Sequence, residues 1–483
     1  MFNSIVRFFW PDIRDLEIKK FGILAATLFC TIGSYWLLRL LKDTVFMKIA
    51  FPIQLGWQPE QGALFQPLAK TLSPLIIIFC VAIYSKLVDI FEKHKLFYVI
   101  CSFYIALFGI ISSLLAFREM NGDEALGRTL MAIIGWLSYF SIESFGSITI
   151  PMFWSFVISI TDSESAKTGF PFILVGAQIG SISGSLLSIF SKEIGGVSIL
   201  FFIGTGIVCL VMALIYIFMK VIPKELLQGE HDSKISKKSK KTKKKEGFIT
   251  GFYNGISIIF KNPYLMGVFI VSTVYEIVGT IIDYQMKRQA SLSEDFAGEA
   301  GFAKFMGIFG VSANGLSFLL ALLGTSYLMK RFGLRVCLFI FPVALGISVI
   351  FLYMYSKFGN ANAGQLLWAT FIVMIVCKGL TYSLNNPTKD MMYIPTTKEA
   401  RYKAKGWIEM FGARTTKMIG SQVTNAFKRD VTTLLIFGTI FSLGIIAFWI
   451  FAAWYVGRKN HELLKDGKVI SQKGAILASE VEH

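Results

Sequence analysis

The sequence is poor in charged residues. Asp, Glu, Lys and Arg make up 16% of its 483 residues, whereas 54% are hydrophobic. Soluble globular proteins carry about 25% charged residues. A single soluble core stops growing near roughly 250–300 residues, so a core cannot hide this much apolar surface. The composition therefore predicts a protein whose main solvent is lipid.

Histidine and cysteine are also scarce, and neither occurs in a reactive pattern. The four histidines fall in polar loops or tails, and the six cysteines sit in or beside apolar runs without metal-ligand spacing. The phosphate-binding pattern G-x-x-x-x-G-K-[ST] is missing as well, which argues against an ATP-driven pump. We expect no enzyme active site, no metal and no cofactor.

Long apolar runs dominate what is present. A membrane-spanning helix needs about 20 mostly apolar residues. Windows of that length predict an all-α integral membrane protein of about twelve spans. The eleventh is weak, because Glu409, Arg414 and Lys417 lie within it. The predicted spans are 21–41, 64–85, 96–117, 129–159, 168–190, 197–219, 264–285, 303–329, 336–356, 362–384, 406–427 and 431–456.

The net charge of +17 comes mainly from Lys and Arg residues in the predicted loops and tails. If the N-terminus is cytoplasmic, the cytoplasmic loops and tails carry 32 Lys and Arg and the opposite loops 10. The bias of Lys and Arg toward cytoplasmic loops therefore places both termini in the cytoplasm. Eight lysines between Lys234 and Lys245 form a block that we expect to be solvated and close to anionic lipid headgroups. We expect no nucleic-acid partner.

The basic loop divides the chain into two halves. We predict an N-terminal six-helix half (1–220), a basic loop with an interfacial helix at 249–260 (221–262), a C-terminal six-helix half (263–456) and a cytoplasmic tail (457–483). Similar segments recur after spans 4 and 10, T-D-S-E-S-A-K-T-G from Thr161 and T-T-K-E-A-R-Y-K-A-K-G from Thr396. Their matched positions favour duplication and an architecture similar to the major facilitator transporters. The glycine- and serine-rich run from Gly176 favours close helix packing over phosphate binding.

Ionisable residues at membrane depth are costly and usually mark a pathway or an ion pair. Arg39 and Lys42 lie on one helix face near the end of span 1, with Asp43 in reach of Arg39. Two cations beside one carboxylate favour an anion site, since guanidinium and ammonium groups bind phosphate. Glu143, near the middle of span 4, can pair with a lysine, bind a ribose hydroxyl or carry a proton. Lys70, in span 2, either reaches the interface or belongs to the site.

The second half holds a larger set. Glu276 and Asp283 are seven residues apart on one face of span 7. Lys378 in span 10 precedes the sequence N-N-P from Asn385, a polar break where we expect the helix to end, and Asn386 of this break is a candidate substrate-binding residue. Span 11 and its preceding loop form a basic amphipathic helix, whose polar side must face a water-filled cavity. Cations from both halves suit a large anion such as a polyphosphate. The residues of this helix are Lys403, Lys405, Glu409, Arg414 and Lys417.

At these residues the chain resembles the nucleotide transporter family, the ATP/ADP translocases of obligate intracellular bacteria and plastids. K-G-L-T-Y-S-L-N-N-P-T-K-D-M-M-Y-I-P (378–395) is similar to the family signature K-G-x-x-Y-S-x-x-x-x-x-K-x-x-x-Y-I-P. L-L-R-L-L-K-D-T from Leu37 resembles its L-R-x-x-K-D segment, and W-P at Trp10 its opening motif. The family's transport residues correspond to Lys42, Glu143 and Lys403, with Lys405 as the alternative to Lys403.

The resemblance implies ATP:ADP antiport by alternating access in the inner membrane of a bacterium. It also implies a major-facilitator-like fold and, by default, a monomer. Three motifs depart from the family. E-L-W-G in span 4 reads E-S-F-G here, and K-S-G-G in span 11 reads K-M-I-G. In span 7 the family pattern V-E-x-x-W-K is not matched residue for residue, and Glu276 and Asp283 lie on either side of its expected position. Proton-coupled import, a wider range of nucleotides including NAD, and a carrier for another organic anion therefore stay open as alternatives.

Overall fold

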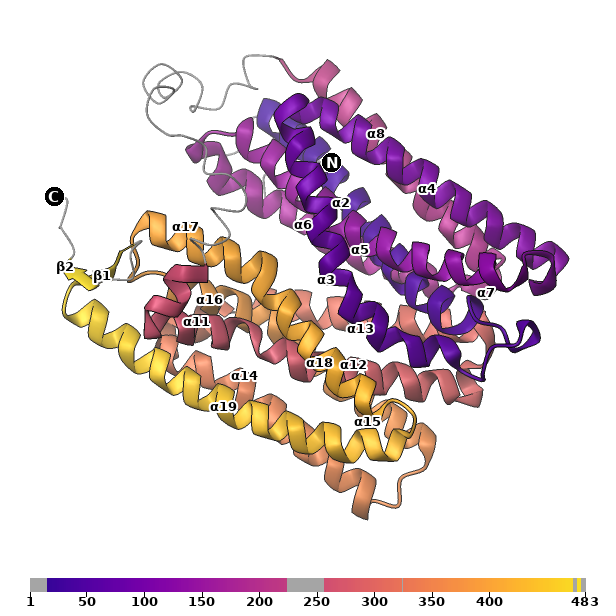
Figure 1. Ribbon diagram of the computed structural model, residues 1–483. Helices are drawn as coiled ribbons and strands as arrows, with labels where there is room; N and C mark the ends of the chain where they lie inside the picture. The colour runs from indigo at the N-terminus through magenta and orange to yellow at the C-terminus, as the bar shows by residue number, and fades with distance from the viewer. Residues whose placement is uncertain (1–14, 224–255, 324, 472–475, 479–483) are drawn as a thin grey trace. The chain divides into compact units, whose positions relative to one another are not determined.

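The computed structural model describes residues 15–223, 256–323, 325–471 and 476–478, and these residues are almost entirely helical (Figure 1). Trp10, the lysine block 234–245 and most of the predicted interfacial helix lie outside the described residues. Within that helix, residues 256–260 are helical.

The described chain forms two compact units. The first takes residues 15–63, 75–223 and 294–314, and the second takes 64–74, 256–293 and most of the residues from 315 onward. Each unit thus contains a helical segment from the opposite half of the sequence. The segment 64–74 contains Pro67 and ends at Pro74, and both prolines lie inside one long helix. Proline removes an i→i−4 hydrogen bond and kinks a helix, so this helix has two places at which it can bend.

The elements follow one another as a chain of long helices with short connections. Residues 15–223 form α2 (Asp15–Thr44), η1 (Val45–Ile49), η2 (Ile53–Leu55), α3 (Gln61–Ile90), α4 (Lys93–Asn121), η3 (Asp123–Ala125), α5 (Gly127–Ser159), α6 (Ser163–Ile189), α7 (Ser191–Ile194) and α8 (Val197–Val221). From residue 263 onward the elements are α11 (Pro263–Thr273), α12 (Tyr275–Leu292), η6 (Glu294–Phe296), α13 (Gly298–Leu323), α14 (Thr325–Phe358), α15 (Ala363–Leu380), η7 (Thr381–Asn385), α16 (Asn386–Met392), α17 (Lys398–Trp407), η8 (Ile408–Gly412), α18 (Ala413–Phe427), α19 (Val431–Lys465), β1 (Lys468–Ile470) and β2 (Ile476–Ala478).

Eleven helices of the described residues are long and apolar enough to cross a membrane. They coincide with the predicted spans except for the eleventh, 406–427. That segment is helical but amphipathic, because η8 and α18 carry the charged residues that weakened the prediction. The expectation that span 10 ends at N-N-P is wrong. The helix passes through a π-helical turn, η7, and continues as α16 to Met392. Pro387 lies in the first turn of α16, directly after η7.

A glycine seam joins α6 to α2 in the first unit. Gly176, Gly180 and Gly184 follow one another at intervals of four and therefore share a helix face. A Cβ atom at Gly180 would lie 2.4 Å from the backbone oxygen of Phe29, and one at Gly184 would lie 2.1 Å from that of Gly33. The two backbones are thus in direct contact, as small-residue helix interfaces allow. This confirms close packing as the role of the run from Gly176.

The second unit uses the same device. A Cβ atom at Gly420 on α18 would lie 2.7 Å from the backbone oxygen of Ile277 on α12. The fifth predicted span of each half therefore packs on the first through a glycine that touches backbone. This agreement supports the internal duplication.

The repeated segments also begin helices in the same way. Asp162 accepts hydrogen bonds from the backbone N–H groups of Ser165 and Glu164 and caps α6. Thr397 caps α17 by accepting one from Ala400. Asp162 lies between two spans, and the N–H groups that bind its carboxylate hold its pKa below the ordinary value.

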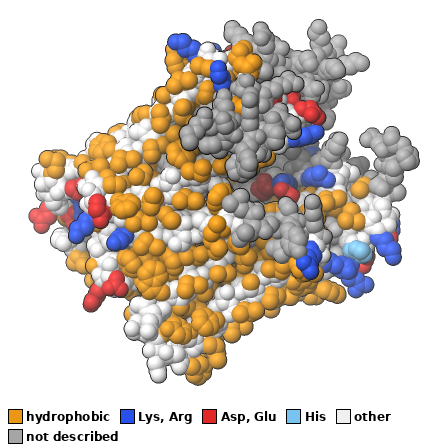
Figure 2. Space-filling model, turned by 180° about the vertical axis from the view of Figure 1, so that it is seen from behind, with side chains coloured by type: hydrophobic (Ala, Val, Ile, Leu, Met, Phe, Trp, Pro, Cys, Tyr) orange, Lys and Arg blue, Asp and Glu red, His pale blue; other side chains and the backbone are white. Residues whose placement is uncertain are grey.

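Apolar side chains predominate on the surface shown in Figure 2. Phe79 on α3, Phe103 on α4, Ile347 on α14 and Phe451 on α19 are each more than 60% exposed. Large exposed apolar areas mark contact with another apolar phase, and here the length of the helices makes that phase lipid.

Substituting Gly180 by Leu should prevent the first unit from assembling. The new side chain would collide with backbone rather than with a movable side chain, and overpacking costs about 1–3 kcal/mol or more. Size-exclusion chromatography of a fluorescent fusion should show loss of the monodisperse peak. Gly206→Leu on α8, where nothing lies within 4 Å, is the matched control and should behave like the wild type. Monodisperse Gly180→Leu protein would contradict the seam.

Candidate functional site

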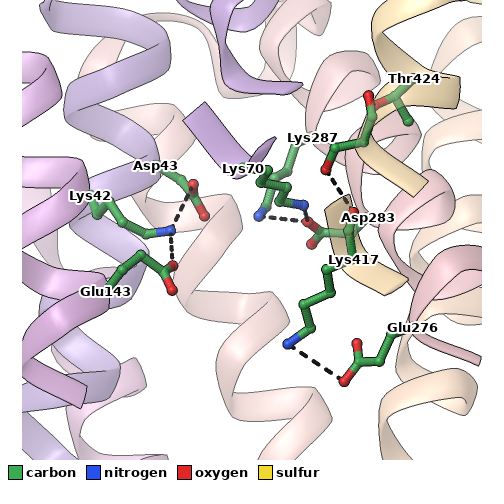
Figure 3. Close-up of polar contacts among 10 residues, drawn as sticks. Lys42, Asp43, Lys70, Glu143, Glu276, Asp283, Lys287, Lys417 and Thr424 are labelled. Atoms are coloured by element: carbon green, nitrogen blue, oxygen red, sulfur yellow. Dashed lines mark hydrogen bonds and ion pairs between the residues drawn. The ribbon is translucent and has the colours of Figure 1, made fainter. Parts of the chain in front are cut away.

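Lys42 is a deeply buried cation of the first unit. It lies in the last turn of α2 and is 3% exposed. Its ammonium group donates to Oε1 of Glu143 on α5 at 2.7 Å and lies 3.5 Å from Oδ1 of Asp43 (Figure 3). The ring of Tyr139 lies 4.1 Å away, which adds a cation–π contact. The prediction that Glu143 can pair with a lysine is confirmed, and Lys42 is its partner.

Arg39 lies one helical turn before Lys42. Its guanidinium group covers the indole of Trp36 at 4.8 Å and also approaches the ring of Tyr35 at 5.9 Å. Stacking on aromatic faces holds the flat guanidinium group in one orientation.

Glu276 forms the centre of a second cluster, in the second unit. The seventh span is interrupted at Val274, between α11 and α12, and Glu276 lies in the first turn of α12. Its Oε1 accepts a hydrogen bond from the hydroxyl of Tyr275 at 2.8 Å and lies 3.5 Å from the ammonium group of Lys417 on α18. Lys378 and Lys389 also interact with this carboxylate electrostatically. The Lys389 ammonium lies 4.6 Å from the centre of the Tyr275 ring.

Asp283 belongs to a separate cluster, two turns further along α12. Its Oδ2 accepts from Lys70 at 2.5 Å and from Lys287 at 2.9 Å (Figure 3). Lys70 comes from the part of α3 that belongs to the second unit. The spacing of acid and lysine in V-E-x-x-W-K is the spacing of Asp283 and Lys287. Asp283, not Glu276, thus matches that pattern in register, with Met286 in place of the tryptophan.

The remaining predicted residues lie on the helices after span 10. Lys405 on α17 donates to Asp390 on α16 at 2.7 Å and lies 3.8 Å from Glu409. Lys403, on the same helix, is half-buried. The charged contacts of these predicted residues in the second half therefore form three groups, one at Glu276, one at Asp283 and one at Asp390. Asn386 is exposed at the start of α16, and Arg414 is half-buried in the first turn of α18.

The sequence reasoning missed two lysines of these clusters. The predicted span ends at residue 285, so Lys287 and Arg288 are predicted to lie in the loop that follows it. The helix continues to Leu292, and both side chains are 5% exposed. The interval of four residues between Asp283 and Lys287 is the sequence signal that could have identified this pair. Lys389 stands in the signature of 378–395, but the helix was expected to end before it.

The chemistry of these groups is electrostatic. The carboxylates of Glu143, Glu276 and Asp283 each hold one or more ammonium groups in surroundings where an isolated charge would be costly. Phosphate oxygens bind lysine and arginine as carboxylate oxygens do, so an anionic solute can replace a carboxylate as partner. Among the described residues no group of His, Cys, Asp and Glu could hold a metal ion. The arrangement suits reversible binding of anions.

Relatives with curated descriptions match along almost the whole chain. "ADP,ATP carrier protein 1" of Chlamydia muridarum is 24% identical over 532 residues, which cover 99% of this chain and 97% of the relative. "ADP,ATP carrier protein 3" of Rickettsia bellii is 24% identical, with 96% and 99% covered. "ADP,ATP carrier protein 2, chloroplastic" of Arabidopsis thaliana is 25% identical, with 94% and 76% covered.

Solved structures with the same fold are also transporters. A peptide transporter of the POT family in complex with sulfate gives a TM-score of 0.62 at 14% identity, covering 91% of this chain and 95% of that one. The nucleoside transporter NupG gives 0.56 at 16% identity, with 91% and 99% covered. These matches confirm the major-facilitator-like fold. The family model described as TLC ATP/ADP transporter matches residues 1–460, and the chain belongs to this family.

Proposed function

We propose that this protein transports nucleotides across a membrane by alternating access and that it exchanges ATP for ADP. The observation that carries the proposal is the Lys42–Glu143 pair, two residues to which the sequence resemblance assigns a part in transport. The Glu143 side chain is 28% exposed, so a solute that approaches this carboxylate can compete for the ammonium group of Lys42.

The phosphates are the part of the substrate that these cations recognise. Lys42 and Arg39 of the first unit would bind phosphate oxygens, as would Lys378, Lys403 and Lys405 of the second, with Arg414 in support. Glu143 and Glu276 would then be released from their lysines to bind ribose or base. Asp283 would stay paired with Lys70 and Lys287, and Asn386 would contribute a polar contact.

Exchange follows from the cost of burying unpaired charge. At Glu276 a single carboxylate faces Lys417, Lys378 and Lys389, and closing the carrier around them without a further anion desolvates more positive than negative charge, which low-dielectric surroundings penalise strongly. A bound nucleotide removes that penalty, so return of the carrier is fast only with a nucleotide on board. We further propose a monomer in the inner membrane of a bacterium with both termini in the cytoplasm.

Uptake of labelled nucleotides tests the function. Bacteria that express the protein should take up labelled ATP, and unlabelled ADP should compete. Uptake should persist with an uncoupler if exchange rather than proton coupling drives it. GTP, CTP, UTP and NAD as competitors define the substrate range.

Within that assay, Lys42→Gln should reduce ATP uptake at least about tenfold, because loss of a charged hydrogen bond costs about 1.5–3 kcal/mol. Lys19→Gln, an exposed lysine of the same helix, is the matched control and should leave uptake unchanged. Wild-type uptake by Lys42→Gln, with equal amounts of protein in the membrane, would contradict the proposed site.

The Asp283 cluster should matter for stability. Asp283→Asn leaves two ammonium groups without their shared carboxylate, and breaking a buried pair costs about 3–5 kcal/mol. The purified variant should unfold at a clearly lower temperature, and Asp283→Asn with Lys70→Met should recover part of the loss. Glu462→Gln, which breaks an exposed pair with Arg458, should change little. An unchanged unfolding temperature for Asp283→Asn would show that the pair contributes nothing.

A further inference from the structure

The end of α19 leads into a strand that binds a distant segment. The chain turns at Gly467, whose positive φ of 60° favours glycine, and forms the antiparallel hairpin of β1 and β2. The backbone N–H of Ile470 donates to the carbonyl of Pro395 at 3.0 Å, and its carbonyl accepts from the N–H of Thr397 at 2.9 Å. These two bonds flank Thr396 and join it to Ile470 as a parallel bridge.

The segment held in this way connects two helices. Pro395–Thr397 lies between α16 and α17, and Thr397 is the N-cap of α17. The start of the same connection is held as well, because the hydroxyl of Tyr264 donates to the carbonyl of Met392 at 2.5 Å. Asn460 on α19 donates to that hydroxyl at 2.7 Å. The connection is therefore held at its start by Tyr264 of α11, to which Asn460 of α19 is hydrogen-bonded, and at its end by β1.

Burial distinguishes the inner and outer sides of the hairpin. Ile470 is fully buried, whereas Ile476, its partner on β2, is 48% exposed. The contact therefore depends on one apolar side chain and two backbone hydrogen bonds. Full burial of an isoleucine and two such bonds together are sufficient to order a short segment.

We propose that β1, through Ile470, is a positioning element for substrate binding. It fixes the start of α17, and α17 carries Lys403 and Lys405. The hydrogen bond from Lys405 to Asp390 then sets α17 against α16, the helix of Lys389. Without the strand, the start of α17 would be held less firmly, and part of the cost of ordering it would fall on nucleotide binding, at the expense of affinity. This inference rests on the proposed function for its transport readout.

The test compares Ile470→Asp with Ile476→Asp, its matched exposed control, and with the conservative Ile470→Val. In an uptake assay normalised to protein in the membrane, Ile470→Asp should raise the half-saturating ATP concentration by roughly three- to tenfold. Maximal uptake per carrier should change less. Ile476→Asp and Ile470→Val should behave like the wild type. Ile470→Ala serves the same comparison if the aspartate variant does not reach the membrane.

Hydrogen exchange of the purified full-length protein provides a readout that needs no transport. The amide of Thr397 should exchange slowly in the wild type and faster in Ile470→Asp or Ile470→Ala. Unchanged protection of Thr397 would show that β1 does not hold the connection. Faster exchange with an unchanged half-saturating concentration would show that the contact has no role in binding. If the wild-type protein takes up no nucleotide, the proposed function fails, and the exchange result alone decides the structural part.

Discussion

The ion pair between Lys42 and Glu143 is the interaction on which the account depends. It joins α2 to α5 inside a chain that spans a membrane, where neither charge is tolerated alone. Each group is acceptable because the other is present, and the carboxylate is released when an anion takes its place beside the lysine. The second unit repeats this arrangement at Glu276, where one carboxylate faces Lys417, Lys378 and Lys389. Binding and conformational change are then two consequences of the same desolvation cost.

The packing of the helices keeps these charges in place. Backbone contact through Gly176, Gly180 and Gly184 fixes α6 against α2, the helix of Lys42. In the second unit Gly420 fixes α18, the helix of Lys417, against α12, the helix of Glu276. A glycine seam is rigid, because neither backbone can give way. The sequence thus places direct backbone contacts on the helices that carry the charges.

Much of this was readable from the sequence, for identifiable reasons. Apolar runs predict spans well because lipid imposes one length on every helix, and the in-span charges were visible as exceptions. Pairing was harder to predict. Lys70 and Asp283 are 213 residues apart, and only the fold brings them together. The break in span 7 at Val274 and the continuation of span 10 through η7 were missed, because π-helical turns and interruptions leave the hydrophobic pattern intact. The contact of Ile470 with the connection before α17 was not visible either, since the pair Val469 and Ile470 in a polar tail is too short to show periodicity.

Exchange in proteoliposomes tests directly whether the carrier returns only with a bound nucleotide. Vesicles containing the purified protein and loaded with labelled ADP are diluted into buffer with or without ATP, and release of label is followed. We expect release only when ATP is present outside, because closing the empty carrier would desolvate more positive than negative charge and the carrier therefore does not reorient without a phosphate partner. Release at the same rate into buffer without nucleotide would contradict it.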